Sequence, residues 1–444
     1  MLARADMRVR YSFQIMNGKH RVTLAVISDL HFCNARTEGS GSELSHVVIQ
    51  KFHESPGKNP WIDLMELVKR ENIQADLLLC PGDITTHAAH EPLKVAWRSL
   101  IDLGRELHVS LMACATGNHD VCSRISDTTE KKEAAKENSN PIRELDNPQD
   151  LFENLKLLSP EYPLHVYADT DIHVTKRQRR IQYFGADFIM HEDEHYRIIV
   201  FNSCARHIND KAIYERGIIA NSTLIELREQ LKVASTPKIN IFLCHHHPIP
   251  HSNAGAGSYD FIFRGDELVR CLQEHGDWVI IHGHKHDGRI VYASHGSPAS
   301  APVVFSASSM GAILSSEQLN KYRNQFYLLD IYLPEKGCSR GTVRVWNWHL
   351  SNGWSKSIDP RVGLTDGVGF GERRHPDDLA EKVAQSVNIE SVAWSTVVEE
   401  FPFINNLTPA ALNDLLKSLN RHHDIVEMRD PNSNCITEIG RSAK

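Results

Sequence analysis

Five apolar segments of this chain are each followed at once by a short polar block, and this repeat restricts the fold more than any other feature. The apolar segments are VTLAVIS, ADLLLC, VSLMACAT, INIFLC and DWVIIH. Continuous apolar runs of this length are typical of strands buried on both faces of a sheet. The polar blocks are Asp29-Leu30-His31, Gly82-Asp83, Gly117-Asn118-His119-Asp120, His245-His246-His247-Pro248 and Gly283-His284-Lys285-His286. Because ligands bind at the carboxyl ends of strands in open α/β sheets, the repeat predicts a single site at that edge.

Helical patterns alternate with the first of these strands. One covers residues 62–68 before ADLLLC, and a second covers residues 92–107 before VSLMACAT. Alternation of helices with buried strands predicts a parallel or mixed sheet. From Val303 the sequence pattern changes to the strand-like segments VVFSAS, QFYLLDIYL and TVRVWNWHL, at spacings typical of an antiparallel meander. We therefore expect a two-sheet α/β sandwich in which the meander forms a second sheet packed against the first.

The chain divides into a large domain, a linker and a smaller appendage. Residues 21–350 are expected to form the large domain, with a strongly charged insertion at about 122–150 directly after the third polar block. A solvated loop or surface helix is the simpler interpretation of this insertion, and a mobile flap beside the site is the alternative. Residues 351–376 are rich in Gly, Ser, Asp and Pro, which predicts a linker.

Residues 377–444 are expected to form a mainly helical module. DDLAEKVAQSV and SVAWSTVVEEF are amphipathic at helical spacing, and a third helix begins at Thr408 as N-cap with Pro409 in its first turn. The segments IVEM and CITEI, separated by DPNSN, predict a β-hairpin. Helices followed by a hairpin resemble a winged-helix arrangement. A helical cap or a module for self-association or for binding a protein partner is the alternative.

Bulk composition limits the classes of partner and compartment. The net charge of −7 argues against a broad basic surface for nucleic acid, although it does not exclude a nuclease whose carboxylates bind metal. The nine cysteines are an odd number and form no CxxC pair, a pattern that suits a reducing cytoplasm better than a disulfide framework. Residues 1–20 lack an apolar core, and no apolar stretch approaches the ~20 residues needed to span a bilayer. We expect a cytoplasmic protein that does not enter a membrane.

The residue types in the polar blocks are those that a two-metal hydrolytic centre requires. Such a centre needs a bridging carboxylate, terminal His, Asp or Asn ligands, and open positions for water and substrate. Asp29 and His31 can reach one ion together, and Asp83 follows flexible Gly82 as the natural bridge. The other candidate ligands are Asn118, His245, His284 and His286. The motifs GxSxG and GxxxxGK[ST] are absent, so acyl transfer and P-loop chemistry lack support.

The five blocks, in this order, resemble the pattern D-x-H, G-D, G-N-H-[DE], His and G-H-x-H of the calcineurin-like metallophosphoesterase superfamily. The match runs from Asp29 to His286, more than half of the chain, with every block intact. The resemblance implies two transition-metal ions (Mn, Fe or Zn) and a metal-bridging hydroxide as nucleophile. The implied ligands of the first ion are Asp29, His31, Asp83 and His286. The implied ligands of the second ion are Asp83, Asn118, His245 and His284.

The same resemblance implies that His119 is catalytic and orients or protonates the phosphoester, while Asp120 holds its imidazole. The segment HHHPIP at residues 245–250, Arg216-Gly217-Ile218 and FSASSMGA at residues 305–312 are similar to bacterial cyclic-nucleotide phosphodiesterases. We therefore expect hydrolysis of a nucleotide-type or other small phosphodiester. A DNA or RNA nuclease of the SbcD-like branch is the first alternative. The second is a regulatory protein whose C-terminal module recruits a partner.

Two further residues are candidates for substrate contact. Arg206 follows the apolar strand at residues 196–203, and its guanidinium is suited to bidentate binding of phosphate. An arginine in a surface loop is the simpler interpretation. His246 is expected either to donate to the substrate or to cap its own loop.

Overall fold

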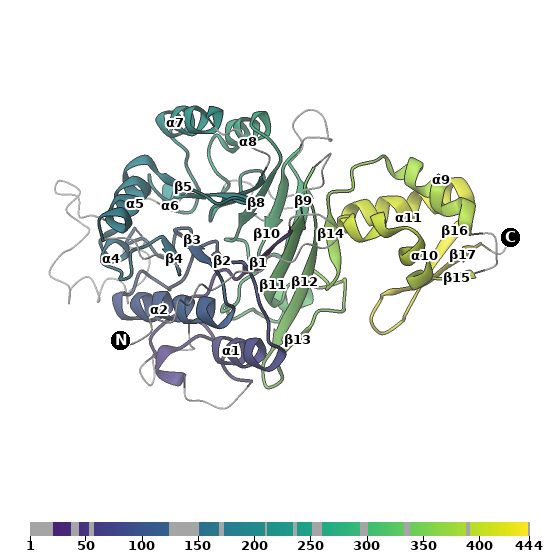
Figure 1. Ribbon diagram of the computed structural model, residues 1–444. Coiled ribbons are helices and arrows are strands. Elements are labelled where there is room, and N and C mark those ends of the chain that lie inside the picture. The colour runs from purple at the N-terminus through teal and green to yellow at the C-terminus, as the bar shows by residue number, and fades with distance from the viewer. Residues whose placement is uncertain are drawn as a thin grey trace, which may run out of the picture.

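The computed structural model describes residues 21–36, 44–52, 57–123, 151–167, 173–208, 211–233, 238–250, 260–293, 301–332, 338–387 and 391–442. Two mixed sheets pack face to face in this part of the chain. Helices α1 (Pro60–Glu71) and α2 (His90–Glu106) lie on the outer side of one sheet, and α7 (Asn221–Lys232) and α8 (Gly265–Glu274) on the outer side of the other (Figure 1). The expected two-sheet α/β sandwich is confirmed.

The first sheet has the order β13-β12-β11-β1-β2-β3-β4, with β14 paired to β12. Strands β1, β2 and β3 run parallel to one another, and the other pairs are antiparallel. The bounds are β1 Arg21–Val26, β2 Leu77–Cys80, β3 Leu111–Cys114, β4 Leu164–Val166, β11 Asn324–Tyr332, β12 Arg340–His349, β13 Gly353–Lys356 and β14 Val368–Phe370.

The second sheet has the order β5-β6-β7-β8-β10-β9, in which β6, β7, β8 and β10 are parallel. The bounds are β5 Phe188–Glu192, β6 Tyr196–Phe201, β7 Ile239–Leu243, β8 Trp278–His282, β9 Arg289–Tyr292 and β10 Val303–Ser306. The other described helices of this part are η1 Ile49–Lys51, α4 Glu153–Lys156, α5 His173–Ala186, α6 Lys211–Tyr214 and η3 Gln318–Asn320.

Alternate residues of the second sheet enter two different hydrophobic cores, which explains why its strands are apolar throughout. Ile241 of β7 packs in the core between the two sheets, together with residues such as Leu24 of β1. Its neighbour Phe242 faces the other way and packs against α7 and α8 through Leu224 and Leu268. A strand that is buried on both faces reads as a continuous apolar run, because successive side chains point to opposite faces.

The meander was expected to form a separate sheet, and this expectation is wrong. β11, β12 and β13 do form an antiparallel meander, but β11 pairs along its length with β1 and so extends the first sheet. β10 belongs to the second sheet, where it runs parallel to β8. Local apolar patterns predict which segments are strands, but the choice of neighbour depends on packing between segments far apart in sequence.

Residues 351–376 were expected to form a linker, and the structure differs. β13 and β14 lie in this stretch and both pair with β12. Ser357 and Leu364 between them are buried. Strands of three or four residues that add to an existing edge obtain their hydrogen bonds from that edge, so a Gly- and Ser-rich segment can join the sheet without an apolar pattern of its own.

The C-terminal region has the element order of a winged helix. The elements are α9 Pro376–Ser386, β15 Ser391–Ala393, α10 Trp394–Glu400, η4 Pro402–Asn406, α11 Pro409–His423, β16 Ile425–Arg429 and β17 Ile436–Arg441. The three strands pair in the antiparallel order β15-β17-β16, which confirms the expected hairpin. Thr408 Oγ1 accepts a hydrogen bond from the backbone N–H of Ala411 at 3.2 Å and caps α11 as expected.

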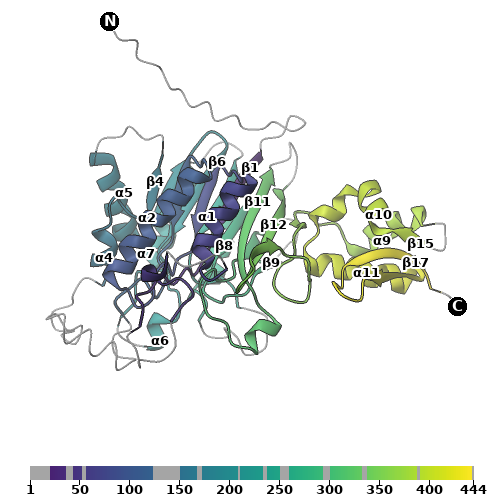
Figure 2. The ribbon, with the colours of Figure 1, turned by 90° about the horizontal axis from the view of Figure 1, so that it is seen from below.

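The winged helix lies at the β12 side of the first sheet, apart from α1, α2, α7 and α8 (Figures 1 and 2). It has a hydrophobic core of its own that includes Leu379, Leu415 and Ile439. The segment at η4 joins it to the sheet, since the Asn406 amide donates to the Tyr332 hydroxyl at 3.1 Å. The charged insertion expected at about 122–150 lies outside the described residues from residue 124 onward. In the described part of the chain, no helix is both long and apolar enough to cross a bilayer.

Candidate metal centre

The seven candidate ligands lie in loops at the carboxyl ends of five strands, as the sequence predicts. Three of these strands, β1, β2 and β3, belong to the first sheet, and β7 and β8 belong to the second. The loop backbones are hydrogen-bonded within each sheet, since Asp29 N–H donates to Gly82 O in the first and Gly283 N–H donates to His245 O in the second. They are also hydrogen-bonded across the sheets, since Met310 N–H in the loop after β10 donates to Ser28 O in the loop after β1. The loops therefore meet where the two sheets face each other at their carboxyl edge.

The first group of donor atoms comes from β1 and β8. Nε2 of His286 lies 3.2 Å from Oδ1 of Asp29 and 3.3 Å from Nε2 of His31. One donor atom from each of these three residues lies within 4.8 Å of the other two. Three convergent donors of this kind can occupy one face of a single metal ion, where distances between ligand atoms of about 3 Å follow from bond lengths near 2.1 Å.

The second group converges on His245. Its Nε2 lies 3.0 Å from Asn118 Oδ1, 3.2 Å from His284 Nδ1 and 3.4 Å from Asp83 Oδ2. Its Nδ1 lies 3.0 Å from the carbonyl oxygen of Pro81, which can only accept, so Nδ1 carries the proton and Nε2 has its lone pair directed into the site. A second ring nitrogen held by a protein oxygen is the usual arrangement of a metal-binding histidine.

Asp83 connects the two groups. Donor atoms of Asp29, Asp83 and His245 lie within 4.8 Å of one another, and all three side chains are almost fully buried. Oδ1 of Asp83 accepts from the backbone N–H of His119 at 2.8 Å, which fixes the carboxylate while Oδ2 faces His245. Its position between a β1–β8 group and a β3–β7–β8 group is the one that a bridging carboxylate occupies.

Five of the seven candidate ligands have left-handed backbone conformations. The φ values are 50° for Asp29, 51° for His31, 51° for Asp83, 75° for His284 and 54° for His286. This region costs a histidine about 1–2 kcal/mol, and such residues collect at functional sites, where the surrounding structure holds them. The turns point these side chains into the space between the loops.

Two glycines let the loops approach closely enough to bring the ligands together. A Cβ at Gly117 would lie 2.1 Å from the backbone nitrogen of Asp83. A Cβ at Gly283 would lie 2.2 Å from Ser28 Oγ and 2.5 Å from Asp29 Oδ2. No side chain larger than hydrogen fits at either position without moving a carboxylate of the site.

Burial and repulsion from a neighbouring ring keep the imidazole of His284 in the neutral form that binds metal. Burial, together with the neighbouring His245, lowers the pKa of His284 to about 3. At His286 burial opposes protonation, but the Asp29 carboxylate beside it raises the pKa above the ordinary value. Burial likewise opposes ionisation of Asp29, yet His286 holds the pKa of that carboxyl well below its usual range. Asp29 is thus a carboxylate at neutral pH, as a ligand must be.

His119 lies beside the first group. Its ring is partly exposed and meets the His31 ring edge-on at 5.0 Å between centroids. Asp120 is buried, and its two oxygens accept from the backbone N–H groups of Thr85 at 3.0 Å and Gly117 at 2.9 Å. These bonds tie together the loops after β2 and β3. The expected role of Asp120 in holding the His119 imidazole stays a prediction.

The two candidate substrate residues are placed differently from the ligands. His246 is fully buried, and its Nδ1 lies 2.8 Å from Ser203 Oγ, so it faces the loop after β6 as well as His284, whose ring centroid is 4.5 Å away. Arg206 is half exposed and forms an ion pair with buried Asp187 at 2.8 Å. The structure brings His246 to the ligand cluster, whereas the guanidinium of Arg206 lies against Asp187. Its contact with substrate stays a prediction.

Asp260 is a residue of this site that the sequence did not reveal. Its Oδ2 lies 3.5 Å from Nε2 of His284 and pairs with Lys285, and its Oδ1 lies 3.6 Å from Nε2 of His247. A single aspartate before the segment FIF carries no recognisable signal, because its neighbours in the site come from another loop.

The fold and the donor set define the class as the metal-dependent phosphoesterases. Residues 22–288 match the calcineurin-like phosphoesterase family, and the chain belongs to that family. Residues 368–421 match the family described as wHTH-Calcineurin_assc, in agreement with the winged helix. The narrower expectation of a cyclic-nucleotide phosphodiesterase is not established by these matches.

Two solved structures are similar to parts of the chain at low identity. The purple acid phosphatase PPD1 from seeds of yellow lupin (Lupinus luteus) is 11% identical with a TM-score of 0.39, over 75% of this chain and 52% of that chain. The chain thus spans about half the length of that phosphatase. A cold-active protein-tyrosine phosphatase of a psychrophile, Shewanella sp., is 12% identical with a TM-score of 0.27, over 70% of this chain and 77% of that chain. No curated protein is similar enough to the chain to match it.

Proposed function

We propose that this protein is a phosphodiesterase with two metal ions, acting on a nucleotide-type or other small phosphodiester. The position of Asp83 carries this proposal, because its carboxylate lies between two groups of convergent donor atoms. Asp29, His31, Asp83 and His286 would hold one ion. Asp83, Asn118, His245 and His284 would hold the other. Such ions, when bound, supply a hydroxide nucleophile near neutral pH and neutralise charge on the phosphate.

The protein groups around the ligands have separate roles. His119 lies beside His31 with its ring partly exposed, so it can reach a substrate oxygen and donate a proton to the leaving group. Asp120 positions the loop that presents His119 and Asn118, through its bonds to Thr85 and Gly117. His246 is fully buried, and we assign it a place beside the centre rather than on the open side where the substrate enters.

The charges near the site favour a diester over a monoester. A monoester carries close to two negative charges at neutral pH, whereas a diester carries one. Two of the cations in the described loops near the site are neutralised: Lys285 pairs with Asp260, and Arg206 pairs with Asp187. Arg216 lies over the rings of Phe261 and Phe263. Cations that are already paired with protein carboxylates, as Lys285 and Arg206 are, give little additional binding energy to a second phosphate charge.

Charge also weighs against the nuclease alternative. Residues 376–442 contain eleven acidic and five basic residues, so the winged helix has no excess of cations for a phosphate backbone. The exposed side chains of α11, the helix that would enter a groove, include Asp414 as well as Lys417 and Arg421. A protein partner for this module is the proposal that its charge favours.

A substrate panel tests the proposal. The protein is loaded with Mn²⁺ and assayed against bis-p-nitrophenyl phosphate, p-nitrophenyl phosphate, cyclic nucleotides and single-stranded DNA. We expect kcat/KM to be highest for a small diester, and Asp83→Ala to abolish that activity. Preference for the monoester would overturn the diesterase assignment, and preference for DNA would favour the nuclease.

A further inference from the structure

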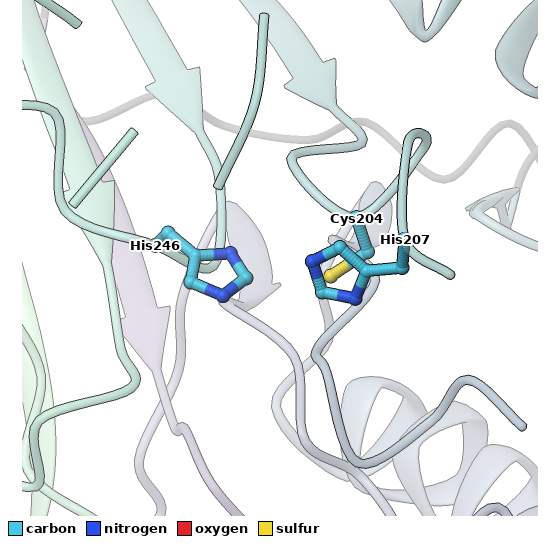
Figure 3. Close-up of side chains that lie close together, drawn as sticks. All are labelled: Cys204, His207 and His246. Atoms are coloured by element: carbon cyan, nitrogen blue, oxygen red, sulfur yellow. The ribbon is translucent and has the colours of Figure 1, made fainter. Parts of the chain in front are cut away.

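A second cluster of metal-binding side chains lies next to the candidate centre. Cys204 and His207 come from the loop after β6, and His246 comes from the loop after β7. Sulfur or nitrogen atoms of these three residues lie within 4.8 Å of one another, and all three residues are buried. Figure 3 shows Cys204 and His207 on one side and the His246 ring facing them from the other. β6 and β7 are parallel neighbours, so their carboxyl ends bring the two loops together.

The hydrogen bonds of the two rings have the arrangement found in metal-binding histidines. Nε2 of His207 lies 3.0 Å from the carbonyl oxygen of Arg216, so Nε2 donates and the lone pair of the neutral ring is on Nδ1. Nδ1 of His246 lies 2.8 Å from Ser203 Oγ. In each ring, one nitrogen is thus held by a protein oxygen, as the second nitrogen of a ligating imidazole usually is.

The other nitrogen of His246 supplies an independent observation. His246 Nε2 is completely buried and has no hydrogen-bond partner among the described residues. Leaving a buried polar atom unpaired costs free energy, and native structures rarely do so without a ligand or a functional reason. The Ser203 hydroxyl can accept a hydrogen bond from Nδ1 of His246. When Nδ1 carries the proton in this way, the lone pair of Nε2 can bind a metal ion.

We infer that Cys204, His207 and His246 form a third metal site, of the zinc type, beside the two-metal centre. One thiolate and two imidazoles are a ligand set for Zn²⁺ or another thiophilic ion, and they exclude Mg²⁺ and Ca²⁺, which take oxygen ligands. The Cys204 thiol donates to the Thr116 carbonyl at 3.2 Å, and its proton is released when the thiolate binds the ion. The inference concerns residues outside the seven candidate ligands and does not rest on the proposed function.

The site would fix the geometry of the neighbouring centre. The ring centroid of His246 lies 4.9 Å from that of His245 and 4.5 Å from that of His284. A metal ion that anchors His246 to the loop after β6 would hold this ring against two of the candidate ligands. The loops after β6 and β7 of the second sheet would then be linked by this ion, in addition to the ligands that the sheet contributes to the two-metal centre.

Cobalt provides a direct test, because a thiolate bound to Co²⁺ gives an intense charge-transfer band in the near ultraviolet. The seven candidate ligands contain no cysteine, so the band reports the third site alone. We expect it in the cobalt-loaded protein, and also in Asp83→Ala, which removes the bridging ligand of the other centre. Cys204→Ala should lose the band. Cys271→Ala, which removes a buried cysteine of α8, is the matched control and should keep it.

X-ray absorption at the zinc edge of the zinc-loaded wild-type protein needs no variant. We expect about one sulfur per three zinc ions, at about 2.3 Å. His207→Gln gives a second way to weaken the site, with circular dichroism to verify folding. Absence of both the cobalt band and the zinc–sulfur distance from the wild-type protein would overturn the inference, as would a band that survives Cys204→Ala. If Asp83→Ala loses phosphodiesterase activity but keeps the band, the two sites are separate.

Discussion

Oδ1 of Asn118 lies 3.0 Å from Nε2 of His245, although 127 residues separate them in the chain. Asn118 follows β3 of the first sheet and His245 follows β7 of the second. The contact therefore depends on the packing of the two sheets as well as on both loops. Any change that shifts one sheet against the other is expected to impair the centre before it unfolds the protein.

Removing the bridging carboxylate should remove the metals. The wild-type protein, reconstituted with Mn²⁺ or Zn²⁺ and desalted, should retain about two ions at this centre. Asp83→Ala should lose most of them, because Asp83 lies between both donor groups. Metal content by mass spectrometry, beside a circular dichroism spectrum, checks the result. Retention of both ions by a folded variant would contradict the bridging assignment.

Replacing His119 should impair turnover while the metals stay bound. His119→Ala removes a ring that neighbours His31, but the variant keeps the backbone N–H that donates to Asp83. We expect kcat to fall by about 10²–10⁴-fold, the range for loss of a general acid. Steady-state kinetics with bis-p-nitrophenyl phosphate, together with metal analysis, measure both effects. Wild-type kcat would mean that the ring is structural.

Asp120→Asn should destabilise the protein. One carboxylate oxygen becomes an NH₂ group that faces the backbone N–H of Thr85 or Gly117, and leaving such a donor unpaired costs about 1–3 kcal/mol. Denaturant titration gives the free energy of unfolding. The matched control is Asp102→Asn, whose exposed carboxylate pairs with Arg105 on the surface of α2 and should change stability by about 0.5 kcal/mol at most. If Asp120→Asn loses activity with unchanged stability, Asp120 acts on His119 instead.

Gly283→Ala should damage the first donor group. Its Cβ would lie 2.5 Å from Asp29 Oδ2, so the carboxylate must leave the position in which its Oδ1 meets His286. We expect weaker metal binding, measured by titration with Mn²⁺ after removal of metal with a chelator. Gly185→Ala is the control, because nothing lies within 4 Å of its Cβ in α5. That variant should bind metal as the wild-type protein does, and equal affinity in Gly283→Ala would show that the loop adjusts freely.

Metal removal should lower thermal stability. Asp29, Asp83 and His245 are packed together with little solvent, and an ion bound only to the folded state stabilises it by mass action. At a metal concentration about 100 times Kd the gain is about 2.7 kcal/mol. Differential scanning calorimetry with and without a chelator checks this, and Asp83→Ala should show little difference between the two conditions. The same Tm for the wild-type protein with and without the chelator would contradict a metal site at this position.

The order of polar blocks after apolar runs was enough to predict the sandwich, the edge where the site lies and the family. It worked because strand periodicity and the carboxyl-edge rule are local and general. The winged helix was also readable, through the Thr408 cap and the hairpin segments. The positions of Asp260 and Arg206 relative to the site could not be predicted from the sequence, because each side chain is held by a partner from a distant segment.

The sequence by itself determined which side chains are delivered to strand ends, and therefore the chemistry of the centre. Tertiary structure decided which strands are neighbours: β11 pairs with β1, and β13 and β14 add to the edge of β12 in place of a linker. It also decided that His246 is buried between His284 and the Cys204–His207 pair. The apolar pattern of a strand does not specify which other strand will be its neighbour. The pairing of the strands and the convergence of their loops therefore depend on how the two faces of each sheet are covered in the folded protein.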